Sequence, residues 1–136
     1  MAVLVIAEHD NSVLKTSTFN TITAATNLSD DIHLLIIGKD IETLSNNAKS
    51  IYPIKKVLKC DNLKLENFIP ELSAPIISNV ANGYTHILAP ASTFGKNLLP
   101  RVSALLDITQ ISDVIEIITE NTFVRPIYAG NAISHV

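Results

Sequence analysis

Apolar residues along the chain fall into short runs that alternate with segments of helical spacing. The short runs are at residues 2–7, 32–37, 54–60 and 87–89. Runs without polar alternation are typical of parallel strands buried on both faces, and we expect this of residues 87–89 in particular. Apolar residues three or four positions apart follow each run, at 16–28, 41–51, 73–80 and 93–106. The pattern predicts four consecutive strand–helix units.

Polar residues mark the expected starts of three helices. Asp40 and Ser73 are predicted N-caps, and Ser92 or Thr93 is predicted to cap the fourth helix through its hydroxyl. Pro75 would then lie in a first turn, where its missing N–H is harmless. Pro100 lies inside the fourth helix and predicts a kink. Lysines at 55, 56 and 59 favour a solvated sheet edge for the third strand, with a phosphate-binding patch as the alternative.

The pattern changes after residue 107, where helical spacing stops. Three strand candidates follow closely, at 114–118, 123–128 and 131–136. Strands joined by such short connections are antiparallel. The prediction is one domain, residues 1–136, with an α/β fold. It is a three-layer sandwich in which helices flank a mainly parallel sheet, as in nucleotide-binding folds, and it ends in an antiparallel β-meander.

Composition narrows the classes of function. The formal net charge of −3 gives no electrostatic footprint for nucleic acid. No apolar run approaches the roughly 20 residues that span a bilayer, so no membrane insertion is expected. The start of the chain lacks the basic segment of a signal peptide. A single cysteine, Cys60, fits a reducing compartment, which would be the cytosol or an organelle matrix.

The turn from the fourth strand into the fourth helix is a candidate anion site. It places Ser92, Thr93 and Lys96 at the carboxyl edge of the sheet, where ligands bind in open α/β folds and where helix N-termini favour anions. A Walker-type loop would need an early glycine and Gly-Lys-Ser/Thr, but Asn97 follows Gly95-Lys96. A structural turn is the favoured interpretation, and a nucleotide pocket is the alternative.

Candidate catalytic residues are few. The four histidines have no metal-ligand spacing and Cys60 has no cysteine partner, so no metal site is expected. His9 follows the first strand between Glu8 and Asp10, at the same sheet edge as Ser92. An acid–base role is one hypothesis for His9, and a surface or capping role is the favoured one. No complete catalytic apparatus emerges, and we do not expect an enzyme.

Arg125 and Tyr128 are candidates for contact with a partner. Residues alternate between the faces of a strand, so Arg125 would share a face with Phe123 and Ile127. An arginine among apolar groups is often paired with a carboxylate or placed at an interface. The alternative is an edge arginine that lies over its own sheet.

Six blocks of sequence, taken together, resemble the amino-terminal domain of the electron transfer flavoprotein alpha subunit. They occur in the family's order and spacing at residues 4–9, 20–25, 84–87, 94–102, 111–113 and 122–132. The two most specific blocks supply the residues that we single out as a partner-interface or structural motif: Phe94, Gly95, Lys96, Asn97, Arg101, Arg125, Tyr128 and Asn131.

The resemblance implies an alpha/beta heterodimer that carries electrons on FAD. Such proteins accept electrons from acyl-CoA and related dehydrogenases of fatty acid β-oxidation and pass them to a membrane quinone oxidoreductase. In the family the flavin lies mainly in a carboxy-terminal alpha domain, and AMP belongs to the beta subunit. The resemblance therefore assigns no catalytic, cofactor-binding or metal residue to this chain, which we expect to be redox-inactive alone and to associate with the beta subunit.

Two other functions remain as alternatives. One is a stand-alone nucleotide-binding module that uses residues 92–96. The other is a self-associating structural domain, since a domain separated from its partners exposes apolar surface. For the isolated chain we expect a homo-oligomer.

Overall fold

The computed structural model describes residues 2–108, 110, 111, 114, 116–119, 122–126 and 133–135, and for residues 116, 122–126 and 133–135 it describes the backbone alone. Strands and helices alternate from β1 to α4, which confirms the four predicted strand–helix units. Their bounds are β1 Ala2–Ile6, α1 Thr16–Ala25, β2 Asp31–Gly38, α2 Glu42–Ala48, β3 Ile54–Asp61, η1 (a 3-10 turn) Leu63–Leu65, α3 Pro70–Val80, β4 Tyr84–Leu88 and α4 Thr93–Leu106.

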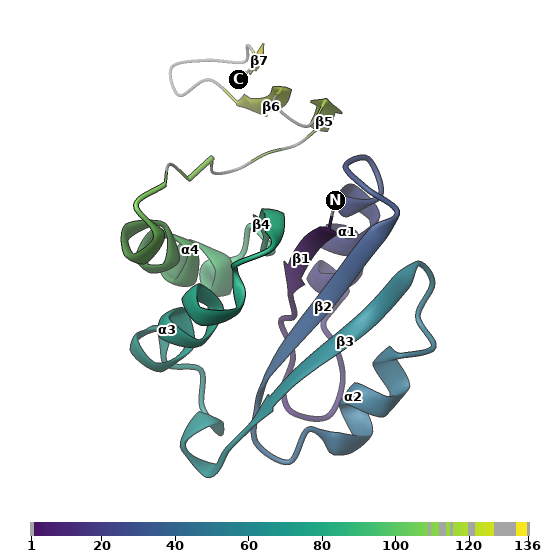
Figure 1. Cartoon of the computed structure of the whole chain (residues 1–136), viewed down its shortest axis with the longest axis vertical. Helices are drawn as coiled ribbons and strands as arrows, with labels where there is room; N and C mark the ends of the chain where they lie inside the picture. The colour runs from purple at the N-terminus through teal and green to yellow at the C-terminus, as the bar shows by residue number, and fades with distance from the viewer. Residues whose placement is uncertain are drawn as a thin grey trace.

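The first four strands form a parallel sheet in the order β3-β2-β1-β4 (Figure 1). The central position of β1 explains its composition, because Val5 is paired with Leu34 on one side and with Leu88 on the other. Residues 3–6 of this strand are fully buried. In β3, at the edge, the three lysines are exposed, as expected for a solvated edge strand.

Helices cover both faces of this sheet, which confirms the predicted three-layer α/β arrangement (Figure 1). Val3 and Val5 of β1 pack with Ile22 of α1 and Leu44 of α2 on one face. Leu4 and Ile6 face the opposite side and pack with residues of α3 and α4, including Ile77, Leu98 and Val102. The two cores follow directly from the alternation of side chains along a strand.

Three further strands form a separate sheet, drawn at the top of Figure 1. They are β5 Glu116–Thr119, β6 Thr122–Pro126 and β7 Ile133–His135, and they pair antiparallel in the order β5-β6-β7. Residues 120, 121 and 127–132, which would connect them, lie outside the described residues. The continuous β-meander therefore stays a prediction.

Two predicted helix starts were wrong. Asp40 does not cap α2: the N-cap is Ile41, and the backbone N–H groups of Asp40 and Ile41 donate to the two carboxylate oxygens of Asp61, at 2.9 and 3.0 Å. α3 begins at Pro70, ahead of Ser73, which is buried inside the helix. A proline suits the first helical turn, and here Pro70 takes the position that Ser73 and Pro75 were expected to mark.

One predicted burial pattern also needed correction. β4 was expected to be buried on both faces, but four of its five residues are half-buried and Thr85 is exposed. Among the described strands β4 pairs with β1 alone, so it forms the second edge of the sheet. In α1, Phe19 is 43% exposed. The buried face of this helix is made by Ile22 and Ala25, together with two threonines, Thr18 and Thr21.

Candidate functional site

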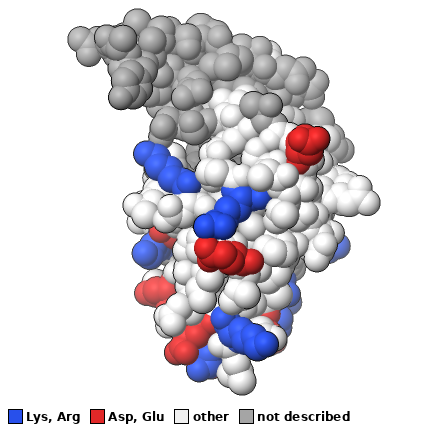
Figure 2. All heavy atoms as spheres, turned by 90° about the vertical axis from the view of Figure 1, so that its left-hand side faces the viewer, with Lys and Arg blue, Asp and Glu red and all other residues white. Residues whose placement is uncertain are grey.

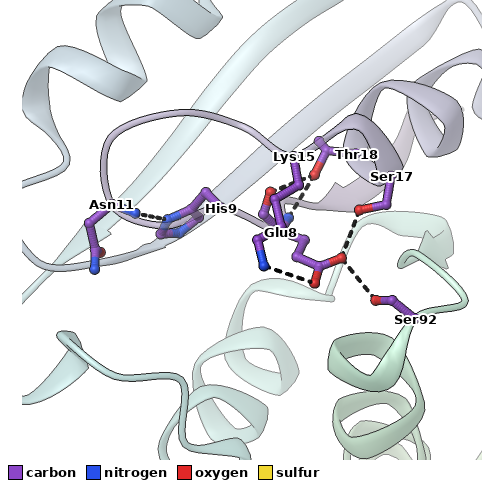
Figure 3. Close-up of polar contacts among 7 residues, drawn as sticks. All are labelled: Glu8, His9, Asn11, Lys15, Ser17, Thr18 and Ser92. Carbon is purple, nitrogen blue, oxygen red and sulfur yellow. Dashed lines mark hydrogen bonds and ion pairs between the residues drawn. The ribbon is translucent and has the colours of Figure 1, made fainter.

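Glu8 is the centre of a polar cluster at the carboxyl edge of the sheet (Figure 3). It lies two residues after the end of β1, and its side chain is only 13% exposed. The Oε1 atom accepts hydrogen bonds from the hydroxyls of Ser17, at 2.7 Å, and Ser92, at 2.8 Å. The ammonium of Lys15 lies 3.8 Å from Oε2. One carboxylate thus joins β1 to the first turn of α1 and to the N-cap of α4.

The position of Glu8 argues against an anion site at the N-terminus of α4. Ser92 is the N-cap residue of α4, as predicted, but its side chain does not cap a backbone N–H of the helix. Its hydroxyl donates to Glu8 instead. Negative charge is stabilised near helix N-termini. The chain's own carboxylate therefore lies where a phosphate was the alternative, and it would repel one.

Thr18 fixes the main chain at the same place. Its Oγ1 accepts from the backbone N–H of Glu8, at 2.8 Å, and donates to the carbonyl of Glu8, at 2.9 Å. The carbonyl also accepts from the N–H of Lys15, at 2.9 Å. Thr18 is fully buried, so these bonds satisfy its hydroxyl inside the core. The role of Glu8 and Thr18 was missed from the sequence, since Ser92 is 84 positions away from Glu8 and no local signal connects them.

His9 has both ring nitrogens engaged. Nε2 lies 2.8 Å from the carbonyl oxygen of Ile37. Nδ1 lies 2.9 Å from the backbone nitrogen of Asn11 (Figure 3). A carbonyl accepts and an N–H donates, so these partners assign the neutral ring with its proton on Nε2. Burial lowers the pKa of His9, and the hydrogen bond to Ile37 opposes this effect in part. The geometry supports the capping role and offers no nitrogen for acid–base chemistry.

Asn11 and Gly38 complete the contact around His9. A Cβ atom on Gly38 would lie 2.5 Å from Asn11 Oδ1 and 2.8 Å from His9 Cε1, so any other residue there would require these side chains to shift. Asn11 Oδ1 accepts from the N–H of Lys39, and its amide donates to the carbonyl of Glu66. These bonds join the loops that follow β1, β2 and η1. His9 and Asn11 therefore hold these loops together at the carboxyl edge of the sheet.

Gly95 has a packing role in the strand–helix turn. A Cβ atom at this position would lie 1.8 Å from the carbonyl oxygen of Pro90. The glycine therefore allows the first turn of α4 to pack against Pro90, in the segment that joins β4 to α4. The close approach is therefore a contact within the chain itself, between Gly95 and Pro90. The favoured interpretation of a structural turn agrees with this contact.

Two other residues of the 94–102 block contact the segment at the start of α3, and two are exposed. The ring of Phe94 packs on that of Phe68, with 4.6 Å between the centroids. The guanidinium of Arg101 is 2.8 Å from a carboxylate oxygen of Glu71 and joins α4 to α3. Lys96 and Asn97 are exposed.

The second family block is only partly covered by the structure. Arg125 lies in β6, where its backbone is paired with that of Ser134, and its side chain is outside the description. Tyr128 and Asn131 lie outside the described residues. The interface roles of these three residues stay predictions.

A groove of about 630 Å³ runs along the exposed edge of β4. α1 contributes Ala24, β4 contributes Ile87, α4 contributes Leu99 and Val102, and Ile111 lines it from the segment that follows α4. The lining is mostly apolar, with a smaller polar part that includes Lys96. Among the described strands β4 is unpaired on this side, so the groove is a surface that a partner could cover.

Other chemical functions find little support in the described residues. Among them, no group of three His, Cys, Asp or Glu side chains is arranged to hold a metal ion, and no helix is long and apolar enough to cross a bilayer. On the face of α3 and α4, Figure 2 shows basic and acidic residues interspersed, without a broad patch of either sign among the residues that it colours. A nucleic-acid interface needs a concentrated basic patch, so the coloured residues of this face do not support one.

Comparison with known proteins gives one consistent family. The sequence profile of the "Electron transfer flavoprotein domain" matches residues 3–136. The chain is 48% identical over 136 residues to an electron transfer flavoprotein subunit alpha of Pseudomonas aeruginosa, covering 100% of this chain and 44% of the relative. It is 44% identical over 141 residues to a mitochondrial alpha subunit of Dictyostelium discoideum, covering 98% of this chain and 40% of the relative.

A plant relative shows the same relation. The mitochondrial alpha subunit of Arabidopsis thaliana is 41% identical over 143 residues, covering 100% of this chain and 39% of the relative. The chain thus spans less than half the length of the curated relatives that it matches. The match extends over nearly all of the sequence, and the chain belongs to the electron transfer flavoprotein family.

Proposed function

We propose that this chain is the amino-terminal, subunit-association domain of an electron transfer flavoprotein alpha subunit. The parent protein would be an alpha/beta heterodimer that carries electrons on FAD, from acyl-CoA and other dehydrogenases to a membrane quinone oxidoreductase. The proposal depends chiefly on one observation: the similarity to alpha subunits covers the whole chain but less than half of each relative. Bacterial and mitochondrial relatives fit a location in the bacterial cytoplasm or the mitochondrial matrix.

The groove beside β4 supports an association role. Strand edges and apolar grooves are costly to leave in water, and partners commonly cover them. Ile87 and Leu99 line this groove without being fully buried. A domain that associates with other subunits or domains is expected to have such an apolar surface.

The described residues do not fit a flavin or nucleotide at the N-terminus of α4. Glu8 presents a carboxylate to Ser92, and the carbonyl of Pro90 fills the space beside Gly95. Either contact would oppose the phosphates of a coenzyme, through charge in one case and through volume in the other. We therefore derive no redox step for this chain, and FAD would be held by other parts of the parent protein.

Association with the beta subunit is the direct test. We expect the tagged chain to co-purify with its cognate beta subunit, and Arg125→Ala to weaken this capture with little change in melting temperature. Lys55→Ala, on the exposed edge of β3 at the other end of the sheet, is the matched control and should leave capture intact. No capture by the wild-type chain would count against the proposal. A loss of stability in Arg125→Ala, with capture retained, would make Arg125 a residue of the fold.

Two measurements on the chain alone separate the alternatives. We expect a purified chain without flavin absorbance, so a stoichiometric flavin spectrum would contradict the proposal. Calorimetry with AMP, ADP and ATP tests the stand-alone nucleotide module. Micromolar binding that Lys96→Ala abolishes would favour that module over an association domain.

A further inference from the structure

The turn between α3 and β4 contains an asparagine followed by glycine in an exposed position. α3 ends at Val80, Ala81 is its C-cap, and β4 begins at Tyr84, so Asn82 and Gly83 form the tip of the turn. Both are exposed. Gly83 has φ +96°, and no atom lies within 4 Å of the position that a Cβ would occupy. The backbone around Gly83 is therefore open on the side where any other residue would carry its side chain.

The backbone bond that closes this turn does not involve the N–H of Gly83. The N–H of Tyr84 donates to the carbonyl of Ala81, at 3.1 Å. Among the described backbone bonds outside helices and strands, none uses the Gly83 nitrogen as its donor. This nitrogen belongs to the peptide group that follows Asn82, so its attack on Cγ of the Asn82 side chain would close a five-membered ring. It can approach the amide carbon without breaking a bond that holds the turn.

From this geometry we propose that Asn82 is a site of spontaneous deamidation through a cyclic imide. The backbone nitrogen of Gly83, once deprotonated, attacks Cγ of Asn82, so that an N–Cγ bond forms and the Cγ–Nδ2 bond breaks. The amide nitrogen leaves as ammonia after taking up a proton. Water then opens the five-membered ring at either carbonyl and leaves aspartate or isoaspartate at position 82. No oxidant or enzyme is needed, and the nucleophile is the chain itself.

The sequence provides the contrast that makes this site specific. Gly83 is the only glycine that follows an asparagine in the chain. Asn67 and Asn97 are also exposed, but Phe68 and Leu98 follow them. A large side chain on the following residue hinders the approach of its nitrogen, whereas glycine offers no Cβ and a freer backbone. Asn97 is in addition held in the regular backbone of α4.

Deamidation here would act on the start of β4. It adds one negative charge to a formal net charge of −3. Isoaspartate also inserts a methylene into the main chain at residue 82, so the backbone is lengthened ahead of Gly83 and Tyr84. The Tyr84 hydroxyl lies 2.7 Å from His33 Nδ1, and His33 Nε2 lies 2.9 Å from Asp31, so this strand start is tied across the sheet to β2. The lengthened backbone should therefore loosen β4, the strand that borders the groove.

Peptide mapping of the purified chain tests the proposal. After incubation at physiological temperature and mildly alkaline pH, we expect the Asn82 peptide to convert roughly tenfold or more faster than the Asn67 and Asn97 peptides, because only Asn82 precedes glycine. Conversion should slow at mildly acidic pH, and the product should include isoaspartate, which an isoaspartyl methyltransferase labels.

Asn82→Gln is the matched variant, since it keeps an amide but would require a less favourable six-membered ring. It should abolish the acidic charge variant that the wild-type chain accumulates. Equal rates at Asn82, Asn67 and Asn97 in the wild-type chain would overturn the proposal. Persistence of the charge variant in Asn82→Gln would overturn it as well.

Discussion

Gly38 and Gly95 are glycines for the same physical reason, although they lie in different turns. In each case another part of the chain comes closer than a Cβ atom allows: Asn11 and His9 approach Gly38, and the carbonyl of Pro90 approaches Gly95. Neither glycine is among the residues with positive φ. Gly83 is the opposite case, with φ +96° and open space around it. Space constrains two of these positions, and backbone conformation constrains the third.

Gly95→Ala is expected to be the more damaging of two alanine substitutions. The new Cβ would meet a backbone oxygen at 1.8 Å, so the turn from β4 into α4 must shift. We expect a loss of about 2–3 kcal/mol in the free energy of unfolding, as for overpacked sites. Gly83→Ala should cost only about 1 kcal/mol, for the strain of its positive φ. Urea unfolding of both variants measures the difference, and equal losses would contradict the packing role of Gly95.

His9 predicts a pH dependence of stability. Burial holds its folded-state pKa below the ordinary imidazole value of about 6.5, so the unfolded chain takes up a proton first as the pH falls. The contribution of the neutral ring is fully present above about pH 6.5 and is lost progressively below it. In His9→Gln, stability should fall less between about pH 7.5 and about pH 5.5 than in the wild-type chain. Urea unfolding at a series of pH values checks this, and parallel curves would show that His9 does not contribute.

At the scale of elements, Glu8 acts as the connector between layers. It extends from the end of β1, and its carboxylate accepts from residues of α1 and α4, which belong to opposite helical layers. The two hydroxyls would each need another acceptor if the carboxylate were removed. Glu8 therefore links the position of α4 to that of α1 across the edge of the sheet.

Two substitutions separate hydrogen bonding from charge at this connector. Glu8→Ala leaves the hydroxyls of Ser17 and Ser92 without their acceptor, and we expect a loss of about 2 kcal/mol in the free energy of unfolding. Glu8→Gln keeps an acceptor oxygen and removes the charge beside two helix N-termini, for an expected loss of about 1 kcal/mol or less. Thermal and urea unfolding measure both. An alanine variant as stable as the glutamine variant would mean that these hydrogen bonds add little.

The elements themselves were largely predictable from the sequence, because periodicity is a local property. The four strand–helix units, the solvated edge of β3 and the proline in α4 all follow from neighbouring residues. Features that depend on distant residues were missed. The carboxylate that accepts from the backbone just ahead of α2 belongs to Asp61, about twenty positions away, and the partner of Ser92 is Glu8. The half-burial of β4 likewise depends on its place in the strand order, which no local pattern contains.

At the scale of the whole molecule, the two edges of the parallel sheet differ in polarity. The edge of β3 is covered with lysines, whereas the edge of β4 borders an apolar groove between α1 and α4. Charged edge residues discourage association between sheets, and an apolar edge favours it. The groove is therefore the surface through which we expect the isolated chain to associate with itself.

Light scattering at high protein concentration tests this expectation, which is a dimer or a weak oligomer of the isolated chain. Leu99→Glu places a charge in the groove and should shift the chain to a monomer. Leu105→Glu is the control, since Leu105 is exposed on the same helix but is not part of the groove lining. A monomeric wild-type chain would contradict self-association, and dissociation by both variants would place the contact elsewhere on α4.

The carboxylate of Glu8 has a consequence for the order in which a larger protein could be assembled. Because Glu8 belongs to the chain itself, its carboxylate supplies a negative charge near the N-terminal ends of α1 and α4 as the domain folds. Refolding of the domain should accordingly proceed at the same rate in buffers with and without phosphate or nucleotide. Under the proposed function, this domain would fold before it meets a partner subunit or a coenzyme.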